Sequence, residues 1–244
     1  MKNFIFVLAL LFIITACDKN ENSPTEPGQD SNITPQIQSI LFTGPSKTNT
    51  DPTFHAQAAS SFATSFNSMF LFASSFSMTP AQKNGNIWKW VIQQVNLTIT
   101  VETEKKSDGS YNWKCTYNGT DNYGNQFNNW VVWKGIVSAD GKTGNWEFYD
   151  SDSKTIENKF SYAVDSQGKK TGTIEYYNNG KVIQRIILIN NPDGSGSLDL
   201  YEEYTSGITS GLYKSMHIEW KADGSGSWQE FDEKGFVSDS GSWT

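Results

Sequence analysis

The chain has 244 residues, a formal net charge of −7 and two cysteines. This length suits one sizeable domain, and an acidic chain without a basic cluster is not expected to bind nucleic acid or anionic lipid headgroups. One cysteine, Cys115, is in phase with the aromatic residues around it, which predicts a buried small hydrophobic residue rather than a nucleophile.

The N-terminus predicts a secretory signal. Lys2 precedes an apolar run from Phe4 to Ile14, and small residues then lead to Cys17. This order is typical of a cleaved signal peptide. The apolar run is too short for a permanent membrane-spanning helix. Residues 1–16 are therefore expected to be absent from the mature protein.

The segment Ile14-Thr15-Ala16-Cys17 resembles the lipobox of bacterial lipoproteins. The resemblance implies cleavage after Ala16, lipid modification of Cys17 and anchoring by more than one acyl chain, as stable attachment to a membrane requires. The expected location is the cell envelope, with the outer membrane favoured. The leaflet stays open, because Asp18 is similar to an inner-membrane retention signal of enterobacterial lipoproteins, whereas residues 18–21 are similar to surface-export signals of Bacteroidetes lipoproteins.

Residues 17–50 read as a lipid-anchored flexible tether. They are rich in Asn, Ser, Thr and Pro and poor in apolar residues, a composition that does not offset the entropy of ordering. The segment 36–42 is the exception, because Ile37, Ile40, Leu41 and Phe42 would allow it to dock on the domain as an extra strand.

Residues 51–80 predict one amphipathic helix that belongs to the following domain. Asp51-Pro52 is a start signal and Thr79-Pro80 closes the segment. Its apolar stripe is expected at Phe62, Phe66, Met69, Ala73 and Phe76. Because no charged residue lies between the two prolines, the helix is expected to pack against a sheet, with insertion into a membrane as the alternative.

From residue 81 to residue 244 the apolar residues alternate with polar ones, and Asp-Gly or Asn-Gly pairs mark tight turns. About a dozen strands are expected, at 87–92, 95–101, 111–117, 130–137, 146–150, 158–164, 173–177, 182–189, 197–204, 215–220, 227–231 and 236–243. Turns this short permit only antiparallel pairing between neighbours. The predicted fold is all-β, an up-and-down meander that forms a barrel or a curved half-barrel, with the helix on its apolar face.

Four stretches repeat a turn followed by a strand. The clearest copies begin at Asp223 and Asp193, and looser ones begin at Asp140 and Gly172. Together with the phrases at residues 176–181 and 230–235, the region 139–243 is similar to bacterial MORN-type and YD-type repeats. Those families are also arrays of β-hairpins, and the resemblance implies no catalytic residue.

Alignment of the four copies predicts a stripe of candidate ligand-binding residues on one face of the sheet. Carboxylates and aromatic rings recur at alternate positions: Glu147, Glu175 and Asp199, then Tyr149, Tyr177, Tyr201 and Phe231. If each copy is every second strand, the stripe repeats about every 10 Å. Sugar rings stack on aromatic side chains and bond to carboxylates, so the stripe is a candidate site for an extended glycan. The competing interpretation is that the aromatic pairs only stabilise the sheet.

The predicted function is that of a membrane-anchored lipoprotein of the cell envelope that presents a non-catalytic binding domain for a glycan or an envelope protein. The alternative is a carrier that holds a lipid or another hydrophobic ligand inside the barrel. An enzyme is not predicted, because His55 and His217 are the only histidines and no nucleophile motif accompanies them. No residue spacing indicates a metal site or a cofactor.

Overall fold

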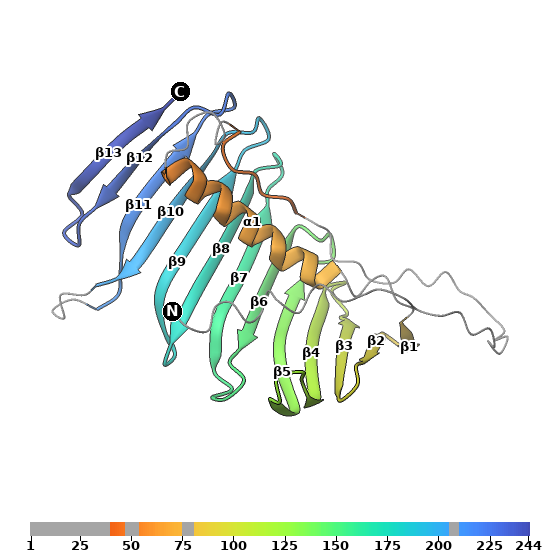
Figure 1. Ribbon diagram of the computed structural model, residues 1–244. Coiled ribbons are helices and arrows are strands. Elements are labelled where there is room, and N and C mark those ends of the chain that lie inside the picture. Colours follow the sequence, from red (N-terminus) through yellow and green to blue (C-terminus); the bar gives the residue numbers. More distant parts are fainter. Residues whose placement is uncertain (1–39, 47–53, 75–80, 205–209) are drawn as a thin grey trace. The chain divides into compact units, whose positions relative to one another are not determined.

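The computed structural model describes residues 40–46, 54–74, 81–204 and 210–244, with side chains described up to residue 70 in the second range. All of them belong to one unit, Pro35–Thr244. The unit is a single antiparallel sheet of thirteen strands in sequence order, crossed on one face by one helix (Figure 1). The strands are β1 (Gln82–Asn84), β2 (Ile87–Gln93), β3 (Leu97–Lys105), β4 (Tyr111–Thr120), β5 (Gln126–Val137), β6 (Thr143–Tyr149), β7 (Ile156–Val164), β8 (Lys170–Asn178), β9 (Lys181–Asn190), β10 (Gly196–Glu203), β11 (Leu212–Trp220), β12 (Gly226–Phe231) and β13 (Val237–Trp243).

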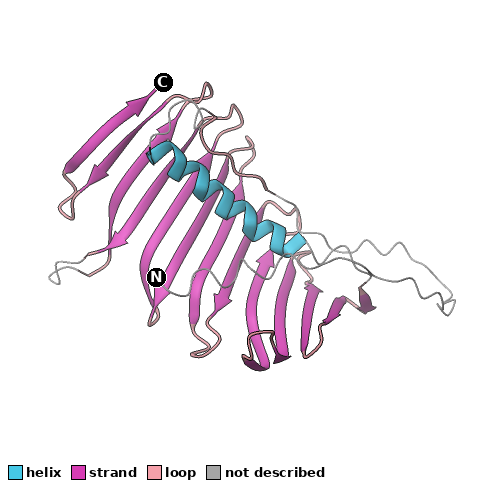
Figure 2. Cartoon of the chain, viewed as in Figure 1, coloured by secondary structure: helices cyan, strands magenta, loops and turns pink. Residues whose placement is uncertain are grey.

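The sheet is open. β1 pairs only with β2 and β13 only with β12, so the two ends do not meet, and Figure 2 shows them far apart at opposite sides of the sheet. The predicted meander is confirmed, and the closed barrel is wrong. The physical reason is that α1 covers the apolar face, so the sheet does not need to close on itself to bury that face.

The repeated Asp-Gly motif forms the tight turns between strands. In seven turns, four of which contain Asp-Gly, the N–H of a glycine with positive φ donates to the carbonyl three residues earlier, as Gly224 does to Lys221 at 2.9 Å. In the Asp-Gly-Ser copies the carboxylate accepts hydrogen bonds from both the N–H and the hydroxyl of the serine, as Asp223 does from Ser225 at 2.9 and 2.6 Å. The motif therefore sets the hairpin geometry.

The second glycine of the motif makes room for an aromatic ring on the next strand. A Cβ atom at Gly226 would collide with the ring of Trp243, and one at Gly196 with the ring of Trp220. Each indole also donates to the carbonyl of the turn glycine, Trp243 to Gly224 at 2.7 Å and Trp220 to Gly194 at 3.2 Å. The indole ring, the turn and the second glycine thus pack together, and the sheet contains this arrangement both at Gly196 and at Gly226.

The helix α1 (Phe54–Ser74) lies diagonally across one face, here called the inner face (Figure 1). Its buried apolar residues are Ala56, Ala59, Ala63, Phe66 and Phe70, at spacings of three and four. The predicted stripe was therefore rotated: Phe66 is central, Phe62 and Met69 lie at the margin, and Ala73 and Phe76 lie outside the described side chains. The small alanines let the helix approach the sheet closely. No helix in the described ranges is long and apolar enough to cross a membrane.

Residues 40–46 run between the helix and the sheet and form no strand. Two side-chain amides make the hydrogen bonds to the segment's backbone that a neighbouring strand would otherwise make. Asn67 of α1 accepts from the Phe42 N–H at 2.8 Å and donates to the Phe42 carbonyl at 2.9 Å. Asn190 of β9 makes the same pair of bonds with Thr43, both at 2.8 Å. The expected extra strand is thus replaced by an extended segment held by amides, and residues 36–39 lie outside the described ranges.

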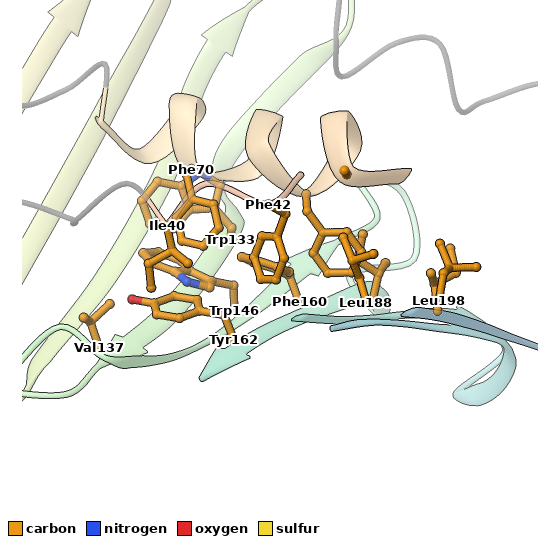
Figure 3. Close-up of a cluster of buried hydrophobic side chains, with 14 of the residues drawn as sticks. Ile40, Phe42, Phe70, Trp133, Val137, Trp146, Phe160, Tyr162, Leu188 and Leu198 are labelled. Atoms are coloured by element: carbon orange, nitrogen blue, oxygen red, sulfur yellow. The ribbon is translucent and has the colours of Figure 1, made fainter. Parts of the chain in front are cut away.

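The core fills the space between α1, the segment 40–46 and the inner face (Figure 3). The rings of Phe42, Phe66 and Phe160 meet at centroid distances of 5.1 and 5.7 Å. A Cβ atom at Gly172 would lie 2.5 Å from Phe66 and 2.9 Å from Phe42, so this position on β8 must stay bare for the rings to fit. Cys115 is fully buried as predicted, and burial raises the pKa of its thiol.

We expect Asn190→Ala to lower the free energy of unfolding by about 2–4 kcal/mol, because two hydrogen bonds disappear and the Thr43 N–H and carbonyl lose their partner. Asn190 is only 3% exposed, so water cannot easily replace the amide. Denaturant unfolding followed by tryptophan fluorescence measures the change. Asn178→Ala, at an exposed position of β8, is the control and should cost far less. Equal costs for the two variants would contradict the role given to Asn190.

Candidate functional site

The predicted candidate residues lie on the outer face of the sheet, opposite α1. One row of side chains crosses this face with one residue from each strand from β2 to β11, each the Cα partner of the next. We call it the charge row: Lys89, Glu102, Lys114, Lys134, Glu147, Lys159, Glu175, Arg185, Tyr201 and Lys214. At about 4.8 Å per strand the row is roughly 43 Å long.

The β6 and β8 copies of the repeat form matching units. The hydroxyl of Tyr149 donates to Glu147 at 2.7 Å, and that of Tyr177 donates to Glu175 at 2.8 Å. Lys159, on the strand between them, pairs with Glu147 at 3.1 Å and lies over the ring of Tyr177 at 5.6 Å. Each carboxylate therefore holds a tyrosine from its own strand, and the lysine connects the two units.

Arg185 and Lys134 complete these two units. Arg185 pairs with Glu175 at 2.7 Å, and Lys134 lies over the ring of Tyr149 at 5.1 Å. The hydrogen bond from Tyr149, helped by Lys159, lowers the pKa of Glu147 below its ordinary value despite partial burial. Burial and the bonds to the carboxylates raise the pKa values of Tyr149 and Tyr177 to about 12. At neutral pH Glu147 is thus charged and the two tyrosines are donors.

The β10 copy is shifted by two residues relative to the others. Asp199 is opposite Ile187, and Tyr201 is opposite Arg185, so Tyr201 stands in the row of the carboxylates rather than beside Tyr177. The predicted single stripe is therefore broken between β8 and β10. The turns before β8 and β10 have the same length, residues 165–169 and 191–195, but the repeat copy begins at Gly172, two residues after the start of β8, and at Gly196, the first residue of β10.

Asp199 receives two basic side chains from β11. Lys214 pairs with it at 2.8 Å and lies over the Tyr201 ring at 5.6 Å, and His217 Nδ1 is 2.6 Å from the same carboxylate oxygen. Burial alone would raise the pKa of Asp199, but the hydrogen bonds from His217 and Lys214 lower it. Phe231 of β12 is partly exposed and lies beyond the last member of the charge row.

The sequence analysis missed the basic partners of the stripe. Lys159, Arg185 and Lys214 lie on the strands between the repeat copies, and Lys134 lies on β5, the strand before the first copy; all four are in the same polar phase as the carboxylates. Pairing each copy with the strands on either side of it, rather than with the next copy, would have revealed them, because adjacent strands supply the direct neighbours. The stripe is therefore a network of paired charges.

Each of the two histidines lies beside a carboxylate, His55 beside Glu230 and His217 beside Asp199. His55 stacks on Trp228 at 3.7 Å and its Nε2 lies 2.9 Å from Glu230, which fastens the start of α1 to β12. In the described part of the chain no serine, threonine or cysteine is hydrogen-bonded to His55 or His217. The same residues contain no group of three or more His, Cys, Asp or Glu side chains that could hold a metal ion. Cys17 lies outside the described ranges.

No protein-family profile matches the chain. A search of curated proteins likewise returned no match.

We expect His217 to stabilise the fold in a pH-dependent way. The hydrogen bond to Asp199 raises the pKa of His217 in the folded state, against the opposing effect of burial. The contribution is therefore complete below about pH 6.5, the ordinary histidine pKa, and is lost as the pH rises through the raised value. Unfolding free energies of the natural chain and of His217→Gln should converge over this window.

An NMR titration of the imidazole provides the direct measurement. In the natural chain His217 should titrate above its ordinary pKa, and in Asp199→Asn the value should fall back. An unchanged His217 pKa in that variant would show that Asp199 is not the cause.

Proposed function

We propose that this chain is a lipid-anchored protein of the cell envelope whose sheet binds an extended glycan on its outer face without catalysing a reaction. The observation that carries the proposal is the charge row, which offers one polar side chain per strand along a surface that, in the described residues, no helix covers. Repetition along a straight line suits a polymer better than a compact ligand.

The geometry of the row supports binding because the side chains are held in place before a ligand arrives. Each carboxylate is fixed by a tyrosine or a basic group, which reduces the entropy lost on binding. A carboxylate has about four acceptor sites, so Glu147 and Glu175 keep capacity for ligand hydroxyls after their internal bonds. Their side chains are 37% and 20% exposed, which leaves the oxygens within reach of a ligand.

The competing interpretation is that the row only stabilises the sheet. Exposed ion pairs and cross-strand pairs contribute roughly 0.2–1 kcal/mol each, so the row would add to stability even without a ligand. The two interpretations predict different results when a tyrosine ring is removed and the fold stays intact. Glycan binding should weaken if the row binds the glycan, and no binding should be affected if the row only stabilises the sheet.

Replacing two rings of the stripe tests the glycan proposal. We expect the double variant Tyr177→Ala, Tyr201→Ala to lose about tenfold or more in affinity for a retained glycan, equivalent to about 1.4 kcal/mol, because stacking surface and hydroxyl donors are removed together. Retention on an array of purified bacterial surface polysaccharides, followed by calorimetry on the best ligand, measures the loss.

Tyr123→Ala is the matched control, since Tyr123 is 61% exposed and lies in the turn between β4 and β5, away from the row. It should leave retention unchanged. If the double variant keeps full retention while its stability drops, the row has a structural role only. If the array retains nothing but an envelope protein is captured on the same face, the partner is a protein.

The lipid anchor is tested at Cys17. We expect the natural chain to partition into the membrane fraction of the bacterium that makes it, and Cys17→Ala to be released in unprocessed or soluble form, because the acyl chains can no longer be attached. Mass spectrometry of the N-terminal peptide should show a diacylated cysteine. An unmodified Cys17 in a chain that still resides in the membrane would contradict the lipoprotein assignment.

The alternative function, a carrier for a lipid or another hydrophobic ligand, would require the ligand to bind on an open sheet instead of inside a barrel. The enclosed lumen on which it depended is missing, because the sheet does not close, and α1 occupies the inner face with Phe66 and Phe70. The outer-face proposal is preferred for this reason.

A further inference from the structure

From β2 to β9 the charge row alternates in sign except at one point. From β5 to β9 the members read Lys134, Glu147, Lys159, Glu175 and Arg185, each opposite in sign to its direct neighbour. From β2 the order is Lys89, Glu102 and Lys114. The two runs meet at β4 and β5, where Lys114 is the direct Cα partner of Lys134.

The adjacent lysines on β4 and β5 form a local concentration of positive charge on an acidic protein. Glu102 is shared between Lys89 at 3.5 Å and Lys114 at 3.3 Å, so one carboxylate serves two ammonium groups. On the other side, Glu147 is already bound by Lys159 and by the hydroxyl of Tyr149. Within the described residues no carboxylate lies within ion-pair distance of Lys134, whose ammonium group instead faces the Tyr149 ring. The β2–β5 part of the row thus has three lysines and one carboxylate, on a chain with a net charge of −7.

Like charges directly opposite each other destabilise a sheet. Lys114 is 45% exposed and Lys134 is exposed, so both ammonium groups are accessible from solvent. An anionic group placed between them would turn the repulsion into two charge-assisted hydrogen bonds. The exposed side chain of Ile136 lies two residues from Lys134 on the same face and offers an apolar contact for the C–H face of a sugar.

We propose that the Lys114–Lys134 pair is the anion subsite of the glycan-binding face, and that the ligand is an acidic polysaccharide whose carboxylate, sulfate or phosphate group bridges the two ammonium groups. The inference rests on the proposed function and names the class of glycan. The polymer continues along the paired part of the row, where the signs are balanced and the contacts are made to hydroxyls.

The test compares charged polymers with their neutral counterparts on the full chain. The probes are polygalacturonate and dextran sulfate, matched with methyl-esterified polygalacturonate and dextran. We expect the natural chain to bind at least one acidic polymer at least tenfold more tightly than its neutral counterpart, and we expect the preference to fall as the salt concentration rises.

The variant Lys134→Gln removes one charge of the pair without breaking an ion pair. It should lose about tenfold in affinity for the acidic polymer, while its unfolding midpoint changes little, because relief of the repulsion offsets the lost contact with the Tyr149 ring. Lys221→Gln is the control, since it makes the same change of net charge at an exposed position in the turn between β11 and β12. It should bind like the natural chain.

Each other outcome separates the two proposals. Equal binding of acidic and neutral polymers would overturn the anion subsite and leave the glycan-binding function standing. If Lys134→Gln and Lys221→Gln lose the same affinity for the acidic polymer, the loss comes from the change in net charge alone, and the subsite is also overturned. Binding of polyglutamate as tightly as of the acidic sugars would overturn the glycan as the ligand. No binding to any of the polymers would overturn both proposals.

Discussion

A sheet that is one layer thick has to bury its apolar face without a second sheet, and this constraint governs the rest of the molecule. Here one helix and one extended segment cover that face. The amides of Asn67 and Asn190 hold the segment by hydrogen bonding to the backbone groups of the buried Phe42 and of Thr43. The alanines of α1 and the bare Gly172 then allow the aromatic rings to interlock beneath the helix.

Covering the inner face leaves the outer face for polar side chains. Because direct partners in adjacent strands stand about 5 Å apart, any charge on that face meets a neighbour on each side. The resulting row satisfies most of its charges internally, with Lys159 between Glu147 and Glu175 and with Arg185 paired to Glu175. Lys114 and Lys134 are the one pair of direct neighbours in the row with the same sign. The charges of direct neighbours therefore indicate a binding place for an anion, which the net charge of −7 does not.

The fold was largely predictable from the sequence, since alternation and Asp-Gly turns directly encode strands and hairpins. All the expected strands from Ile87 onward exist, and only the three-residue β1 was missed. Closure was not predictable, because it depends on what covers the inner face. The two-residue shift of Asp199 and Tyr201 was missed because repeats were aligned by sequence, whereas the strand pairing places the start of the copy two residues later in β8 than in β10. The basic partners were missed for the same reason, since they lie on the strands adjacent to the copies.

The order of the strands also bears on how the protein unfolds. Each strand pairs only with its neighbours in sequence, as in a solenoid, so the free energy of the sheet accumulates hairpin by hairpin. The exposed β1 and the terminal β13 have a partner on one side only, and they can detach without disturbing the middle strands. Cooperativity is supplied by α1, which joins β12 to β7 through His55 and Phe70. Loss of β1 or β13 would therefore shorten the array and leave its centre intact, whereas loss of β12 would also release the start of α1.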